Sequence, residues 1–472
     1  MKIDGNIPDE LKHLNLQVYE NSYSATLSLN NILKKNNKFF IIQLLENIID
    51  NKPYNYFIFY RYGRIGQIGE IDIDCYMDLN NALQTFLNTF LEKTGFIWED
   101  RYKDLDIKYK DKYIFTEIYI IEDNVNTSDK SESLITLHIS LINLLTVIYD
   151  YKLYSEFVTQ YDLDEKRMPF GSLSKNQIDK AFKVLNKISD ILKSTEEIAD
   201  KKTLLIDLTS NFYSIIPTYL KSGKIQEINT IEMLDKKIEL LNVLLDSDVL
   251  YKNITDDNLN KYKNLNCNIN VIEPADPIFI LINNYLTSNK GSSHNVNLKL
   301  ISLYECESTR ISEKTFKPTK NTYLLWHGSR TINIVSILIN GLLINPNNVI
   351  INGKMFGNGI YFANCSTKSA AYSSYDNAGY GILLLCEVNL DGMVQYINSY
   401  KNVPANTGIN AIHGVGYYTP NPAKFVKLND CIVPSGELIP SNIANTYLHY
   451  DEFIVYDQSR VKIKYILLVK QT

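Results

Sequence analysis

The sequence LWHGSR at residues 325–330 combines an apolar run, a histidine and a glycine, and it is one of three strings in which the chemistry of the chain is densest. Apolar residues precede His327, and Gly328 follows it. This order predicts a β-strand that ends near His327, beside a backbone that a ligand can approach because Gly328 has no side chain. Taken alone, a histidine here is more often a structural residue than a catalytic one.

Two further strings lie in the same part of the chain. The string MFGNGIYFA at residues 355–363 places Tyr361, a flat aromatic, just after two glycines that free the backbone for close approach. The string YDEFIVY at residues 450–456 places Glu452 at the start of an otherwise apolar strand. Each residue also has an ordinary interpretation: sheet packing for Tyr361, and a solvated carboxylate at a strand edge for Glu452.

Length and composition indicate an ordinary globular protein of several domains. The chain has 472 residues, 45% hydrophobic and 21% charged, which predicts two to four domains and excludes a disordered chain. No apolar run reaches the ~18 residues of a membrane span, and the first residues lack an apolar signal core, so we expect an intracellular protein without membrane contact. The net charge of −5 gives no overall field that attracts nucleic acid.

Local patterns predict three domains, at residues 1–125, 132–258 and 262–472. In the first, strand-like pieces surround one amphipathic helix, which Asp78 caps and Gly95 ends. The second is nearly all helix, with a capping box from Ser174 to Gln177 and a helix break at Pro217. The third is strand-rich. We therefore predict an α+β domain, an all-α bundle and a second α+β domain.

Standard nucleotide-binding motifs are absent. The glycines at 63, 66 and 69 have the wrong spacing for a dinucleotide fingerprint, and the P-loop pattern does not occur. Together, however, the three strings resemble the catalytic domain of the poly(ADP-ribose) polymerase family. They occur in the family's order with the string TKSAAY at residues 367–372, and they carry its His–Tyr–Glu triad as His327, Tyr361 and Glu452. The resemblance implies an ADP-ribosyltransferase fold for the third domain.

The resemblance extends upstream. The strings MPFGSLS at residues 168–174 and NFYSIIP at residues 211–217 resemble the family's helical regulatory domain. YGR at residues 62–64 with KTG at residues 93–95 resembles the WGR domain, with Tyr62 in place of the signature tryptophan. The resemblance implies that the helical domain shields the active site until the first domain binds DNA ends or nicks through Tyr62 and Arg64. Residues 1–112 hold 14 basic and 16 acidic residues, a net charge of −2, which is a weak electrostatic footprint for DNA.

For the third domain, the resemblance implies that NAD is consumed as a substrate and that no metal takes part. Tyr361 and Tyr372 would stack on the nicotinamide ring, and Glu452 would stabilise the positive charge that develops on its ribose. A glutamate at this place favours chain elongation over single transfer. The NAD-binding residues implied by the resemblance are His327, Gly328, Ser329, Tyr361, Lys368, Ser369 and Tyr372.

Three departures from the family pattern bear on NAD affinity or acceptor choice: Leu343, Asn358 and the bulky loop GVGYYTP at residues 414–420. Two alternatives to a poly-ADP-ribosyltransferase stay open, a mono-ADP-ribosyltransferase and a non-catalytic protein that binds NAD or a partner. A glycosidase is disfavoured, because such enzymes usually pair two carboxylates and only Glu452 is suitably placed. We expect protein acceptors, a monomer and, if the chain acts on DNA, a nuclear location.

Overall fold

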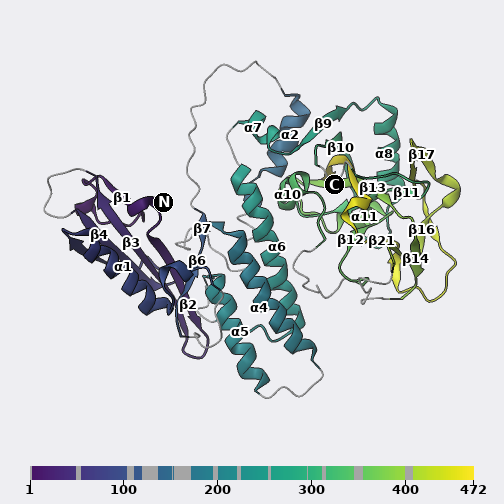
Figure 1. The fold of residues 1–472 in the computed structure, drawn as a ribbon. Helices are drawn as coiled ribbons and strands as arrows, with labels where there is room; N and C mark the ends of the chain where they lie inside the picture. Colours follow the sequence, from purple (N-terminus) through teal and green to yellow (C-terminus); the bar gives the residue numbers. More distant parts are fainter. Residues whose placement is uncertain are drawn as a thin grey trace. The chain divides into compact units, whose positions relative to one another are not determined.

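The chain folds into two compact units in a computed structural model (Figure 1). The first unit comprises Met1–Thr127 and Ser155–Asp248, and the second comprises Ser128–Tyr154 and Val249–Thr472. Contacts within the chain define these two units, and such contacts do not test the three predicted domain ranges. The ranges therefore remain a prediction. The structure describes residues 3–48, 55–103, 111–119, 137–150, 152–153, 172–194, 200–219, 225–253, 257–294, 296–310, 315–344, 355–398 and 408–472.

The first unit contains the predicted sheet with one covering helix. The sheet has the order β5-β4-β3-β2-β6, and β1 pairs with β3. Its apolar face packs against helix α1 (Leu79–Thr94), from which Ala82, Phe86 and Phe90 are fully buried. The strands are β1 (Leu16–Val18), β2 (Ser24–Asn31), β3 (Asn36–Asn47), β4 (Tyr56–Arg64), β5 (Glu70–Tyr76) and β6 (Ile114–Thr116).

The ends of α1 confirm the prediction from sequence. The Asp78 carboxylate accepts a hydrogen bond from the Asn81 backbone N–H at 3.0 Å. Gly95 ends the helix in a left-handed conformation, at φ 80°, and its N–H donates to the Leu91 carbonyl. Leu91 is 43% exposed, because it lies at the edge of the apolar stripe.

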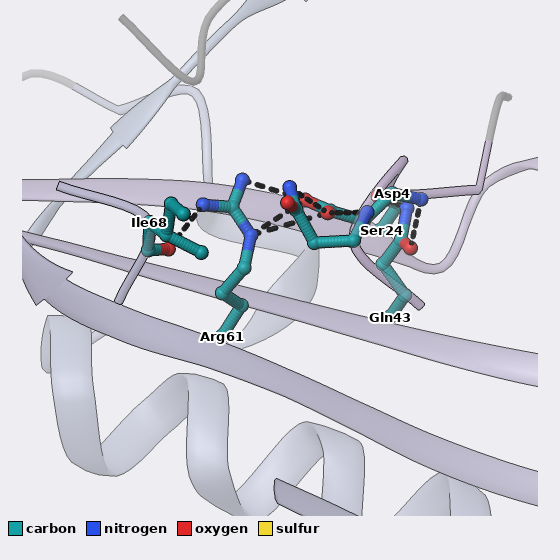
Figure 2. A network of polar contacts seen from close by, with 6 residues as sticks. Asp4, Ser24, Gln43, Arg61 and Ile68 are labelled. Carbon is teal, nitrogen blue, oxygen red and sulfur yellow. Dashed lines mark hydrogen bonds and ion pairs between the residues drawn. The ribbon is translucent and has the colours of Figure 1, made fainter. Parts of the chain in front are cut away.

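A buried ion pair holds the glycine turn between β4 and β5 (Figure 2). The Arg61 guanidinium donates to the Asp4 carboxylate at 2.8 Å and to the Ile68 carbonyl at 2.8 Å. Gln43 accepts from the Asp4 backbone N–H and donates to the Ser24 hydroxyl, which completes the network. Both charged side chains are less than 10% exposed, so the loss of one partner would leave a buried charge uncompensated.

In addition to α1, the first unit contains the helices α4 (Lys175–Lys193), α5 (Lys201–Ile215) and most of α6 (Ile231–Asn253). The Ser174 hydroxyl caps α4 by accepting from the Gln177 N–H at 3.1 Å. Only this half of the predicted capping box is observed: the Gln177 side chain donates to the Ile215 carbonyl, at the end of α5. Helix α5 ends two residues before Pro217, as predicted. Residues 168–171 of the string MPFGSLS lie outside the described residues.

Helix α5 joins the sheet through hydrogen bonds to strand β2 and to Ile32, the residue that follows this strand. The Ser214 hydroxyl accepts from the Asn30 backbone N–H at 2.7 Å, and the Ser210 hydroxyl accepts from the Ile32 N–H at 3.1 Å. Strand β6 pairs with β2 only from Thr26 to Ser28. The two serines therefore satisfy backbone donors that the neighbouring strand leaves unpaired.

The second unit is built on a seven-stranded sheet of order β17-β18-β11-β13-β22-β10-β9. A second sheet has the order β12-β21-β15-β14, and a third has the order β19-β16-β20. The third predicted domain is strand-rich, as expected from its sequence. The strands are β9 (Cys267–Ile272), β10 (Leu298–Ser308), β11 (Thr322–Gly328), β12 (Ile360–Phe362), β13 (Tyr380–Asn389), β14 (Met393–Tyr396), β15 (Ala411–Gly414), β16 (Gly416–Pro420), β17 (Val426–Leu428), β18 (Cys431–Val433), β19 (Leu438–Pro440), β20 (Leu448–Tyr450), β21 (Glu452–Val455) and β22 (Val461–Gln471).

Helices cover the large sheet, and one of them comes from the predicted helical segment. Helix α2 (Ile139–Ile148) buries Leu141, Leu144 and Leu145 in the same apolar cluster as strands β10, β13 and β22. Helix α10 (Ile334–Asn340) joins this cluster, whereas α8 (Pro277–Ser288) packs into a separate one. Among the helices that the structure describes, none is long and apolar enough to cross a membrane.

Candidate active site

Three strands from distant parts of the sequence bring the predicted triad together in the second unit. His327 and Gly328 end strand β11, Tyr361 lies in β12, and Glu452 begins β21. Strands β12 and β21 pair antiparallel, with Tyr361 opposite Ile454. The Trp326 and Ala363 backbones exchange hydrogen bonds at 2.8 and 3.0 Å, which joins β11 to β12. The pairing of strands thus fixes the backbone that carries His327, Tyr361 and Glu452.

The His327 ring is oriented by the strand that carries Tyr361. Its Nδ1 lies 2.9 Å from the Tyr361 carbonyl oxygen. A carbonyl can only accept, so Nδ1 carries the proton in this contact and a neutral ring would keep a lone pair on Nε2. The histidine is therefore held in one orientation and one tautomer.

Gly328 can be no other residue in this backbone. A Cβ atom there would lie 1.7 Å from the Ser369 carbonyl oxygen. Ser369 lies in the short helix α11 (Ser366–Ala370), and its hydroxyl donates to the Trp326 carbonyl at 3.1 Å. Ser329 accepts a hydrogen bond from the Asn333 side-chain amide at 3.2 Å. The glycine that was predicted to admit a ligand is thus also required by contact with α11.

Tyr361 anchors the loop of residues 355–359. Its hydroxyl donates to the Gly357 carbonyl at 2.8 Å and accepts from the Phe356 N–H at 3.0 Å. Gly357 has a φ of 74°, and a Cβ on Gly359 would lie 2.5 Å from the Ile454 side chain. Both glycines therefore have a local structural reason in addition to the predicted close approach of a ligand. Burial and then the Glu452 charge raise the pKa of Tyr361, so its hydroxyl stays protonated at neutral pH.

Tyr372 follows α11 and is 65% exposed. Partial burial of its hydroxyl and the nearby Glu452 carboxylate raise the pKa of Tyr372. The Glu452 charge thus acts on both tyrosines that were predicted to hold a nicotinamide ring. Stacking of this ring stays a prediction.

A lysine–glutamate pair forms the charged centre of the site. Lys368 Nζ lies 3.0 Å from Glu452 Oε1, and the two side chains are 13% and 14% exposed. The same ammonium group donates to the carbonyls of Tyr450 at 2.8 Å and Asp451 at 3.2 Å. Burial lowers the pKa of Lys368, and the attraction of Glu452 only partly opposes this. Lys368 therefore fixes both the Glu452 carboxylate and the backbone just before it.

The chain matches three family models along its length. Residues 279–471 match the poly(ADP-ribose) polymerase catalytic domain, residues 135–269 match the poly(ADP-ribose) polymerase regulatory domain, and residues 23–104 match the WGR domain. Poly [ADP-ribose] polymerase 2 of Homo sapiens is 31% identical over 473 residues, which cover 95% of this chain and 79% of the relative. The chain belongs to the poly(ADP-ribose) polymerase family.

Two other relatives give the extent of this similarity. Poly [ADP-ribose] polymerase 2 of Arabidopsis thaliana is 32% identical over 99% of this chain and 76% of its own length. Poly [ADP-ribose] polymerase 1 of Gallus gallus is 31% identical over 95% of this chain but only 45% of its own length. The chain thus spans about half the length of some curated relatives that it matches.

The WGR match covers the two residues that were predicted to contact DNA. The Tyr62 ring stacks on Phe40, with centroids 5.8 Å apart, and its hydroxyl donates to Asp72 at 2.6 Å. Tyr62 and Arg64 line a hollow of about 770 Å³ on the first unit. Its charged lining is mixed: the basic residues are Lys35, Lys38, Arg64 and Lys93, and the acidic residues are Asp72, Asp74 and Glu92.

Asp451 and His413 were not predicted from the sequence, although Asp451 directly precedes Glu452 of the predicted triad and His413 contacts Asp451. Asp451 is 1% exposed. His413 Nε2 lies 3.1 Å from Asp451 Oδ1, and the imidazole stacks on Phe453 with centroids 4.5 Å apart. Asp451 stood in the string YDEFIVY, but its histidine partner is remote in sequence, so the pair was not visible there.

Proposed function

We propose that this chain is an NAD-dependent poly-ADP-ribosyltransferase, which transfers ADP-ribose from NAD to protein acceptors and elongates the product. The observation that carries the proposal is the Glu452 carboxylate, which Lys368 holds at 3.0 Å and whose charge acts on Tyr361 and Tyr372. Membership of the poly(ADP-ribose) polymerase family supports the same activity.

The proposed reaction breaks the bond between nicotinamide and the ribose C1′ atom, and nicotinamide leaves with the bonding electrons. Glu452 would stabilise the positive charge that develops on the ribose by accepting from its 2′-hydroxyl. An acceptor oxygen then bonds to C1′, and its proton passes to Glu452 or to water. The backbone of Gly328 and the hydroxyl of Ser369 would bind the carboxamide, while His327 would bind a hydroxyl of the adenosine ribose.

The direct test incubates the purified protein with labelled NAD and a protein acceptor. We expect release of nicotinamide and labelled products that form a long ladder on a gel. A single labelled band would indicate mono-ADP-ribosyl transfer. NAD binding without release of nicotinamide would indicate a non-catalytic protein, and the proposed activity would then be wrong.

We further propose that DNA ends or nicks stimulate the enzyme through its WGR domain, and that the protein works in the nucleus. The WGR match and the four basic residues that line the hollow with Tyr62, namely Lys35, Lys38, Arg64 and Lys93, support this proposal. Nicked DNA should raise the rate at low salt, and this effect should fall as salt rises, because phosphate contacts release counterions.

Arg64→Ala should reduce the stimulation by DNA and leave the rate without DNA unchanged. Lys12→Ala is a matched control, because Lys12 pairs with Asp9 on the same unit and lies outside the hollow. A rate that DNA does not change at low salt would contradict the DNA proposal but not the transferase proposal. We also expect a monomer, which light scattering after size exclusion would test.

A further inference from the structure

The carboxylate of Asp451 is buried beside the proposed catalytic glutamate, and it accepts hydrogen bonds from three groups in two other segments of the chain. Its Oδ1 accepts from the Gly416 N–H at 2.8 Å, and its Oδ2 accepts from the Thr419 hydroxyl and the Asn364 amide, each at 2.7 Å. Asn364 follows the strand that carries Tyr361. The side chain thus ties the segment of Tyr361 and the bulky loop at residues 414–420 to the start of strand β21.

His413 adds a fourth contact to the same carboxylate. It lies in β15, which pairs with β21 so that His413 is opposite Phe453 and Gly414 is opposite Glu452. The flat ring stacks on Phe453, and its Nε2 approaches Asp451 Oδ1 to 3.1 Å. Burial raises the pKa of Asp451, but His413 and the hydrogen bonds from Gly416 and Asn364 outweigh it and hold this pKa below its usual value. Asp451 is therefore an anion at neutral pH.

The backbone of Asp451 connects this network to the proposed catalytic pair. The carbonyls of Tyr450 and Asp451 both accept from Lys368 Nζ, which in turn binds Glu452. A shift of the Asp451 backbone would move both acceptors and the first residue of β21. Lys368 and Glu452 would then lose the geometry in which they meet at 3.0 Å.

We propose that Asp451 and His413 are positioning residues for the transfer step, and that they act by fixing the Lys368–Glu452 pair. This inference rests on the proposed transferase function. Neither side chain needs to touch NAD, because their effect passes through the backbone of residues 450–452. Substitution should therefore lower kcat, to which Glu452 contributes, much more than it changes KM for NAD.

Two mild substitutions test the proposal from different sides. His413→Phe keeps a flat ring on Phe453 but removes the nitrogen beside Asp451, and Thr419→Val keeps the shape of the side chain but removes one hydrogen-bond donor. We expect each to lower kcat for nicotinamide release on the order of tenfold, with KM for NAD and the melting temperature nearly unchanged. His413→Gln, whose side-chain amide can donate to Asp451, should restore most of the rate. Tyr447→Ser, at a residue 79% exposed, is the control.

Each outcome decides between the possibilities. If both variants keep the normal kcat, or if kcat, NAD binding and melting temperature fall together, the positioning role is wrong. If the unsubstituted protein releases no nicotinamide, the proposed function fails instead. The positioning role is then tested by the crystal structure of His413→Phe, in which we expect the Lys368–Glu452 distance to exceed 4 Å. An unchanged distance would overturn it.

Discussion

In the proposed mechanism, the Glu452 carboxylate is required for turnover but contributes little to NAD binding. Glu452→Gln keeps the shape of the side chain but removes its charge, so stabilisation of the ribose cation and activation of the acceptor are both lost. We expect chain elongation to fall about 100-fold or more, and NAD affinity to change far less, because stacking and carboxamide contacts remain. Gel analysis of labelled products and calorimetry measure the two effects. Equal loss of both would indicate a misfolded site.

The lowered pKa of Lys368 predicts how kcat changes at alkaline pH. Because burial lowers the pKa of Lys368 below its ordinary 10.5, the ammonium group loses its proton at a lower pH than an exposed lysine would. We expect kcat to fall as pH rises through this lowered pKa, since neutral Lys368 holds Glu452 less firmly. Lys368→Met should lower kcat at neutral pH about tenfold and remove this alkaline decline. A decline that persists in Lys368→Met would assign it to another group.

The lowered pKa of Lys368 also makes the stability of the protein depend on pH. The unfolded chain binds the Lys368 proton more tightly than the folded chain. The free energy of unfolding therefore rises with pH between the pKa of Lys368 in the folded chain and its higher value in the unfolded chain, so the protein becomes more stable over this range. Activity and stability should therefore change in opposite directions over this range.

At the scale of elements, the hydrogen bonds between α5 and β2 hold the sheet and the helices of the first unit together. Ser214→Ala would leave the buried Asn30 N–H unpaired, which costs about 1–3 kcal/mol. We expect this loss in the free energy of unfolding, measured with urea. Thr203→Ala, at an exposed position of the same helix, is the control and should change stability by less than about 0.5 kcal/mol. A loss in Ser214→Ala no larger than in the control would contradict this role.

At the scale of the whole molecule, α2 belongs to the second unit, so a truncation that removes the predicted helical domain should keep α2. The family resemblance implies that this domain shields the NAD site, so its deletion should raise the rate without DNA and abolish stimulation by DNA. A fragment of residues 262–472 would also lose α2, whose Leu141, Leu144, Leu145 and Ile148 are buried against the sheet of the second unit. Each such side chain contributes about 1.5–3 kcal/mol.

We therefore expect two truncations to differ. A protein in which a flexible Gly/Ser linker replaces residues 155–248 should be active without DNA and melt well above the 262–472 fragment. Melting curves and rates of nicotinamide release measure the difference. Equal melting temperatures would show that α2 adds nothing to the second unit, and a low rate in the linker variant would contradict the shielding role.

The sequence by itself determined those features that depend on neighbouring residues. Helix α1 with its Asp78 cap and Gly95 end, the strand-rich character of the third domain and the end of α5 before Pro217 follow from local propensity and periodicity. The three strings also identified the family and predicted the triad His327, Tyr361 and Glu452, because their order and spacing are specific.

Only the tertiary structure decided contacts between residues that are distant along the chain. Local pattern predicted a full capping box for Ser174 and Gln177, but the carbonyl at the end of α5 competes successfully for the Gln177 amide. The predicted helical domain at residues 132–258 includes α2, and only the structure shows that the apolar face of α2 is buried against the second unit's sheet. The contact of His413 with Asp451 depends on the pairing of β15 with β21. Such contacts are fixed by strand order and packing, which no local propensity encodes.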